Sequence, residues 1–166
     1  IGTVPLTIVC ALGLALLLNQ KIFGRNFLRT VSFFPYVASL VAVAAVWNML
    51  FNPSMGPVNQ ILVSLGAENP PRWAAGKETA MLTVILFSVW KNMGYYMIIF
   101  LAGLQGINPE LHEAAGLDGA NKWQQFRNVT LPQLAPTTFF VTIMLVIHSF
   151  KVYNEIYMIT QAGPGT

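Results

Sequence analysis

Charged residues are unusually rare in this sequence. Asp, Glu, Lys and Arg make up 9% of the 166 residues, whereas hydrophobic residues make up 55%. An ordinary soluble domain has about 25% charged residues. Because so few charges cannot cover a water-facing surface, we expect the surroundings of the chain to be mostly lipid. The nine basic residues are scattered along the chain, so the net positive charge does not indicate a nucleic-acid-binding surface.

The sequence also lacks the residues of several kinds of site. Its single cysteine, Cys10, excludes a disulfide framework and a cysteine-based metal site. Since Cys10 lies in an apolar run, we expect a small buried side chain. No glycine-rich loop followed by Lys and Ser or Thr is present, and residues 112–116 lack the second histidine of a metalloprotease helix. We therefore expect no catalytic residue, no metal site and no cofactor bound by this chain.

Four apolar segments can be recognised, at residues 4–18, 31–51, 79–104 and about 134–159. The last three reach the roughly 20 residues that a membrane-spanning helix needs. The first begins almost at the first residue and few residues follow the last, so we expect both ends to be truncated. The sequence predicts an all-α, polytopic membrane helix bundle of about four visible spans, in one transmembrane domain (1–166).

Lysine and arginine are concentrated in two of the three loops between these segments. Loops 19–30 and 105–133 carry five basic residues, against two in loop 52–78. The five are Lys21, Arg25, Arg29, Lys122 and Arg127; the two are Arg72 and Lys77, which Glu68 and Glu78 balance. Because cytoplasmic loops carry an excess of basic residues, loops 19–30 and 105–133 are expected on the cytoplasmic side.

The outer loop contains a short amphipathic pattern. Residues 58–65 lie between Pro57 and Gly66, and three aliphatic side chains recur among them at helical spacing. This favours a short helix at the outer interface, with Trp73 as an interfacial anchor. A scaffold that closes the outer edge of the bundle is the favoured role, and contact with an external binding protein is the alternative.

The inner loop, residues 105–133, has the pattern of two short helices. Pro109 is typical of a helix start, and Gly119 can adopt the left-handed conformation that ends a helix. A second helix is expected at about 121–129, with Pro132 ending it and leading back into the membrane. Two helices joined by a glycine turn form a compact knob that can transmit a push, whereas an unstructured connector could not.

The same loop carries a motif of fixed spacing. It reads Glu113-Ala114-Ala115, three residues, Gly119, nine residues, Val129, one residue and Leu131-Pro132. This motif resembles the signature loop of permease subunits in binding-protein-dependent ABC importers, without a gap. In that family the loop docks on a separate cytoplasmic ATPase. The resemblance implies that the ATPase-docking residues are Glu113, Ala114, Ala115, Gly119, Leu131 and Pro132. A surface hairpin that merely connects two spans is the alternative.

Other stretches resemble the sugar-importing branch of this family, of the maltose and glycerol-phosphate type. They are residues 90–96, 104–107 and 157–166, where Ala162 departs slightly from the usual pair of glycines before Pro-Gly. The resemblance implies the type I ABC importer permease fold and part of a translocation path for a sugar or related polyol, opened by alternating access. It also implies a multi-pass subunit in a bacterial or archaeal cytoplasmic (inner) membrane. The implied partners are a cytoplasmic ABC ATPase dimer that binds ATP and Mg, a second permease subunit and an external solute-binding protein.

Polar side chains interrupt two of the predicted spans. They are Lys91, Asn92, Tyr95, Tyr96 and His148. At 1.5 Å per residue, Lys91 and His148 are expected about 16–18 Å inside, where an ionisable group usually faces protein or water. We predict that these five residues are candidates for the translocation path, because tyrosine rings stack on sugars and amides bind hydroxyl groups. Interhelical hydrogen bonding that holds the bundle together is the alternative for each.

Two functions from other classes remain open at this point. An ion-coupled secondary transporter could use Lys91 and Glu155. Alternatively, Glu155 could form an ion pair with Lys151. An intramembrane enzyme could use His148. Neither alternative accounts for the motif between residues 113 and 132.

Overall fold

The computed structural model describes residues 2–20, 22–66, 72–73, 76, 79–151 and 153–160. Several residues interpreted above lie outside this part: Lys21, Glu68, Lys77, Glu78, the side chain of Glu155 and the tail 161–166. Every regular element in the described part is a helix. The predicted all-α class is confirmed.

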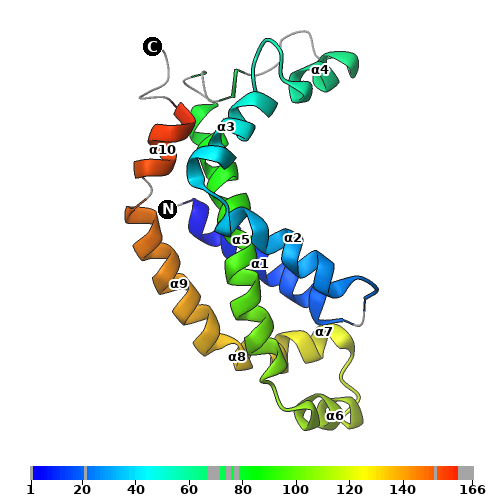
Figure 1. Cartoon of the computed structure of the whole chain (residues 1–166). Helices are drawn as coiled ribbons and strands as arrows, with labels where there is room; N and C mark the ends of the chain where they lie inside the picture. The colour runs from blue at the N-terminus through cyan, green and yellow to red at the C-terminus, as the bar shows by residue number, and fades with distance from the viewer. Residues whose placement is uncertain are drawn as a thin grey trace.

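The helix α5 (Ala80–Gln105) runs through the middle of the bundle, and the other helices are arranged around it (Figure 1). It matches the predicted span 79–104 closely. With 26 residues it is about 39 Å long. Half of its residues are buried, among them Phe87, Met97 and Phe100. Its length and its apolar surface suit a helix that crosses a bilayer and is packed on several sides.

The helix α1 (Thr3–Asn19) lies against α5 and confirms the first predicted apolar segment. Its buried face carries Ala11, Ala15 and Leu18, which pack in one core with Met97 of α5. Small residues at such a contact let two helices approach closely. The prediction for Cys10 is wrong: its side chain is exposed, because it lies outside the α1 face that Ala11 and Ala15 turn towards the core.

The predicted span 31–51 is not one continuous helix, because the chain breaks within it. Two helices form instead, α2 (Arg25–Val37) and α3 (Leu40–Leu50), with a bend of 102° between them. Pro35 in the last turn of α2 cannot donate a backbone hydrogen bond. Ala38 then adopts an extended backbone, with φ −64° and ψ 149°, and ends the helix. The apolar run is thus continuous in the sequence, but the structure divides it into two helices.

The predicted segment 134–159 is also divided. The helix α9 (Ala135–Phe150) ends before Lys151, and α10 (Tyr153–Thr160) follows. The exposed Lys151 lies at the break, outside both helices. The helix α10 packs beside α3, where Asn48 Nδ2 donates to the carbonyl oxygen of Met158 at 3.3 Å. The last segment therefore returns to cover α3 and does not simply extend α9.

By length and composition, one described helix, α5, is suited to cross a membrane alone. Up to three spans result if each of two sharply bent pairs is counted as one span. These pairs are α2 with α3, and the helical run Lys122–Gln133 with α9. The polytopic arrangement is thus built from one straight helix, the shorter apolar α1 and broken helices.

The outer loop forms the short helix that was predicted, α4 (Pro57–Ser64), with Pro57 in its first turn. Its Ile61 is 59% exposed. Trp73, expected as an interfacial anchor, donates from Nε1 to Asn59 Oδ1 at 2.6 Å and packs edge-on against Phe51. Through these two contacts, Trp73 connects the loop that carries α4 to the bundle.

The loop with α4 and the loop that follows α5 lie at opposite ends of α5 (Figure 1), so a membrane around α5 separates them. We expect a cysteine at Lys122 to react with a membrane-impermeant maleimide only after the cytoplasmic side is opened. A cysteine at Ser64 on α4 should react in intact cells. Both positions are exposed, and Cys10 is replaced by alanine beforehand because it is exposed too. Labelling of denatured samples controls for total reactivity, and the reverse pattern would refute the orientation.

The contact between α2 and α5 allows no side chain at Gly94. A Cβ built there would overlap the carbonyl group of Ser32. We expect Gly94→Ala to destabilise the protein by about 1–3 kcal/mol through overpacking. Gly13→Ala on α1 is the matched control, since a Cβ there would meet no described atom within 4 Å and should be neutral or stabilising by up to about 1 kcal/mol. Thermal unfolding of the purified protein in detergent measures both, and equal effects would contradict the close contact.

Candidate functional site

The inner loop forms a compact knob of short helices at one end of α5 (Figure 1). Its first helix, α6 (Pro109–Leu117), has Pro109 in its first turn, where a missing N–H leaves no helical bond unmade. Asn108 caps this end, because its Oδ1 accepts a hydrogen bond from the Glu110 backbone N–H at 3.1 Å. The Glu110 carboxylate adds a negative charge that the helix dipole favours. The predicted helix start is confirmed.

Gly119 ends α6 in a conformation that other residues rarely adopt. Its φ is 81°, in the left-handed region. The N–H of Gly119 bonds to the carbonyl oxygen of Gly116 at 3.1 Å, and that of Ala120 bonds to Ala115 at 2.9 Å. These two bonds form a Schellman motif. Among the described residues no atom would lie within 4 Å of a Cβ at Gly119, so the backbone angle alone restricts this position.

The second part of the knob is one helical run with a wide turn inside it. It begins with α7 (Lys122–Gln125), continues through a π-helical turn (Phe126–Thr130) and ends with α8 (Leu131–Gln133). Asn121 and Gln124 form a capping box at its start, with hydrogen bonds of 2.8 and 2.9 Å. Both ends of the turn between the two parts are therefore fixed by local hydrogen bonds.

Pro132 does not end this run, contrary to the prediction. In the π turn, the N–H of Leu131 bonds to the carbonyl oxygen of Phe126, five residues back. Pro132 then lies in the first turn of α8, where a missing N–H is tolerated. The run bends by 62° into α9 at Leu134, whose side chain is fully buried in the bundle core. The knob is thus joined to the membrane part through a buried residue.

The residues predicted to dock on an ATPase lie at the surface of this knob. Exposed among them are Glu113, Ala114, Gly119, Leu131 and Pro132, while Ala115 is partly buried. Two large apolar side chains of the knob are also exposed, Leu117 at 90% and Trp123 at 66%. A surface that combines a carboxylate with exposed aliphatic and aromatic groups suits contact with another protein. The docking role itself stays a prediction.

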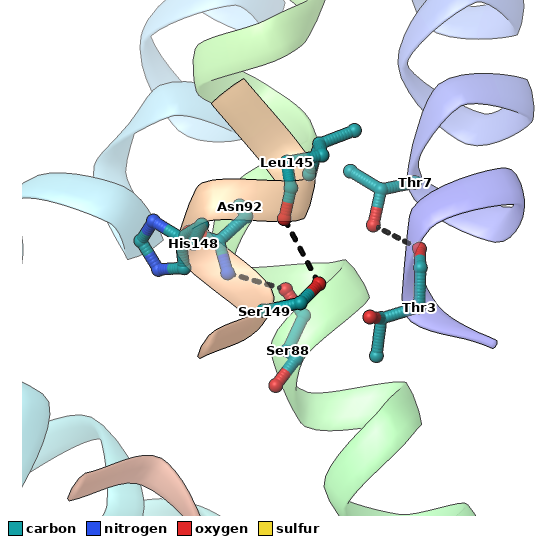
Figure 2. Close-up of a pocket in the computed structure, with 7 residues that line it drawn as sticks. All are labelled: Thr3, Thr7, Ser88, Asn92, Leu145, His148 and Ser149. Atoms are coloured by element: carbon teal, nitrogen blue, oxygen red, sulfur yellow. Dashed lines mark hydrogen bonds between the residues drawn. The ribbon is translucent and has the colours of Figure 1, made fainter. Parts of the chain in front are cut away.

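A small polar cavity lies between α1, α5 and α9 (Figure 2). Its volume is about 20 Å³, enough for a single water molecule. It is lined by Thr3, Thr7, Ser88, Asn92, Leu145, His148 and Ser149. All of these except Leu145 carry a side chain that can form hydrogen bonds. The cavity is therefore a polar site inside a largely apolar bundle.

Several of these side chains donate hydrogen bonds to their own helices, as the dashed lines in Figure 2 show. Asn92, which is 4% exposed, donates from Nδ2 to the carbonyl oxygen of Ser88 at 2.8 Å. Ser149 Oγ donates to Leu145 at 2.9 Å, and Thr7 Oγ1 donates to Thr3 at 2.7 Å. The amide oxygen and the hydroxyl oxygens keep acceptor capacity. A water molecule or a solute hydroxyl could use it.

The structure brings Asn92 and His148 together at this cavity, although the sequence places them in different spans. Sequence reasoning missed Thr7, Ser88 and Ser149. Ser88 lies one turn before Asn92 and Ser149 follows His148, so helical spacing could have found both. Thr7 lies on α1, and no local sequence pattern shows that α1 packs beside α5 and α9.

Lys91 and Tyr95 lie in a second polar group, between α5 and α2. Tyr36 of α2 stacks on Tyr95 with ring centroids 4.5 Å apart and planes inclined by 13°. The Lys91 Nζ lies 5.6 Å from the centroid of the Tyr36 ring. Tyr36 was also missed from the sequence, because an isolated tyrosine in an apolar run gives no sign of its partner.

The five predicted path residues do not share one surface. Asn92 and His148 line the small cavity, and Lys91 and Tyr95 contact Tyr36. Tyr96 is 2% exposed and belongs to the apolar core, with its ring edge-on to Tyr95. Since adjacent residues on a helix point in different directions, whereas residues four apart share a face, one polar stretch serves more than one neighbour.

The position of Lys91 needs an energetic explanation. It is the twelfth residue of α5, about 17 Å from the helix start. A lysine at the centre of a membrane helix costs about 2.5–3.5 kcal/mol on insertion scales. A cation–π contact contributes about 0.5–2 kcal/mol. The Tyr36 ring therefore offsets only part of the cost of placing Lys91 there.

A family model, described as the inner membrane component of binding-protein-dependent transport systems, matches residues 4–165. The probable ABC transporter permease protein YurN of Bacillus subtilis (strain 168) is 39% identical over 167 residues, which cover 96% of this chain and 57% of that protein. The trehalose/maltose transport system permease protein MalF of Thermococcus litoralis is 34% identical over 163 residues, or 98% of this chain and 55% of that protein. The chain thus spans somewhat more than half the length of these relatives.

One similar solved structure is the crystal structure of a bacterial ABC transporter involved in the import of the acidic polysaccharide alginate. It aligns with a TM-score of 0.80 and 28% identity, over 95% of this chain and 58% of that chain. This likeness confirms the predicted importer-permease fold. The described helices correspond to part of that larger fold.

Whether the cavity at Asn92 serves transport or only packing can be tested with a matched pair of variants. Asn92→Leu removes the amide and fills the cavity. We expect it to lower solute uptake by about tenfold, equivalent to about 1.4 kcal/mol, while the complex still assembles. Thr142→Val is the control, since the Thr142 hydroxyl also donates to its own helix, to Thr138 at 2.7 Å, but lies outside the cavity. A fall in unfolding temperature with unchanged uptake would assign the cavity to packing.

Proposed function

Because the chain belongs to the family of inner membrane components of binding-protein-dependent transport systems, we propose that it is the membrane-spanning subunit of an ATP-driven ABC importer. In this role it forms part of the path of a sugar or related polyol, which opens to each side in turn. The names of two relatives support the solute class, since one is a trehalose/maltose permease and the other imports alginate. Both solutes are carbohydrates.

The observation that carries this proposal is the knob formed by residues 109–133. Its parts are held by the Asn108 cap, the Gly119 turn and the Asn121 capping box. A body stabilised by local bonds at each of its ends can receive a force without deforming. It presents Glu113 and exposed apolar side chains to the partner and is joined through Leu134 to α9. These features suit a subunit that is moved by another protein.

The partner that moves the knob is a cytoplasmic ABC ATPase dimer, which binds ATP and Mg and hydrolyses the ATP. This chain carries no catalytic role in the proposal. A second permease subunit completes the path. An external solute-binding protein delivers the solute, and the family description, which names a binding protein, supports this partner. The subunit lies in a bacterial or archaeal cytoplasmic membrane, with loops 19–30 and 105–133 inside.

Coupling between ATP hydrolysis and transport through the knob can be tested at two positions, one that contributes a charge to the docking surface and one that forms the turn. Glu113→Lys reverses an exposed charge and should weaken ATPase docking, because an unpaired charge left at a buried contact costs about 2–5 kcal/mol. Gly119→Val keeps that charge but places a β-branched residue at φ 81°, which disfavours the turn. Both variants should lose solute-stimulated ATP hydrolysis and co-purify less ATPase, while the ATPase keeps its nucleotide binding.

The controls separate docking from general damage. Gly119→Asn should retain most activity, because asparagine tolerates the left-handed conformation. Glu110→Lys reverses a charge at the start of the same helix, outside the predicted docking set, and should affect hydrolysis less than Glu113→Lys. Normal transport by a correctly inserted double variant, Glu113→Lys with Gly119→Val, would show that the loop is only a connector.

A further inference from the structure

We infer that Lys91 selects an anionic solute, by pairing its ammonium group with the carboxylate or phosphate of an acidic sugar in the translocation path. The inference rests on the proposed transport function and adds to it the charge of the solute. It starts from a cation, near the middle of α5, that the rest of the described chain does not neutralise.

No carboxylate in the described part of the chain lies where it could pair with Lys91. The acidic side chains described there are Glu110, Glu113 and Asp118. All three lie in the knob beyond Gln105, whereas Lys91 is about 21 Å before Gln105 along the helix. The ammonium contact that the structure shows is with the face of the Tyr36 ring. An anion from outside the chain would supply the missing charge.

Two features make Lys91 a binding group and not only a packing group. Its side chain is partly exposed, and its ammonium lies beside the Tyr36 ring. It also lies too deep along α5 to reach the headgroups, since snorkelling serves lysines near helix ends. Intramembrane ionisable groups that stay at such a depth mark ion or substrate pathways.

The tyrosines beside Lys91 suit a carbohydrate in particular. The stacked pair of Tyr36 and Tyr95 offers aromatic surface for the apolar face of a sugar ring, and the phenol groups can bind its hydroxyls. The ammonium lies next to this stack, 5.6 Å from the Tyr36 centroid. A cation next to aromatic rings fits a sugar that carries a negative group. A neutral sugar would leave the lysine uncompensated.

The test uses the complete importer, with its second permease, ATPase and binding protein, in proteoliposomes. The probes are digalacturonate, glucose 6-phosphate and maltose, which carry a carboxylate, a phosphate and no charge. We expect ATP-coupled uptake of an anionic probe and little uptake of maltose. Lys91→Gln should reduce uptake of the anionic probe by about tenfold or more, because it removes one partner of a charge pair. Lys91→Arg should keep most of it, because arginine retains the positive charge.

Several results would overturn the inference. ATP-coupled uptake of maltose alone would do so while leaving the proposed sugar importer intact. Unchanged anion uptake by an assembled Lys91→Gln complex would also overturn it. So would recovery of uptake when Glu155→Gln is added to Lys91→Gln, since this recovery would show that Lys91 pairs with Glu155 within the chain. If the Lys91→Gln complex fails to assemble, two measurements still test the inference: anion uptake by the Lys91→Arg complex, and the preference of the wild-type complex for anionic probes over maltose. Absence of ATP-coupled uptake of every probe by the wild type would count against the inference and the proposed function together.

Discussion

The close approach of α2 to α5 at Gly94 determines what surrounds the polar residues in the middle of the bundle. The Ser32 carbonyl group lies where a side chain at Gly94 would have to be. Tyr36 is one helical turn beyond Ser32, and Tyr95 follows Gly94 directly, so this contact brings the two rings into stacking distance. Lys91 precedes Tyr95 by one turn, which places its ammonium over the Tyr36 ring. A single missing side chain thus positions an aromatic pair and a cation.

The knob and the bundle differ in how far their structure could be predicted. The start of α6, the turn at Gly119 and the start of α7 were readable because each depends on hydrogen bonds between residues a few positions apart. The motif added the docking set, which the fold alone would not identify. The π turn before Pro132 was missed, because a proline pattern also fits the end of a helix.

The bundle was predictable in outline but not in its breaks. Composition and length located all four apolar segments, since the lipid environment constrains them strongly. The bend between α2 and α3 follows Pro35, a residue that membrane helices also tolerate, whereas the separation of α10 from α9 depends on contacts with other helices, such as Asn48 with Met158. The same reason explains why Tyr36 and Thr7 were missed and why Cys10 was misjudged. Periodicity reports the orientation of residues on one helix, but not which helix lies opposite.

The helical run of the knob meets α9 at Leu134, which is packed against α5. Leu134 is fully buried, and a Cβ at Gly103 of α5 would lie only 3.0 Å from its Cδ2. On one side of this point the helical run leads to the exposed knob, and on the other α9 carries His148 to the polar cavity. Because the chain passes from the knob to α9 through this buried residue, a displacement of the knob would reach the cavity by way of Leu134.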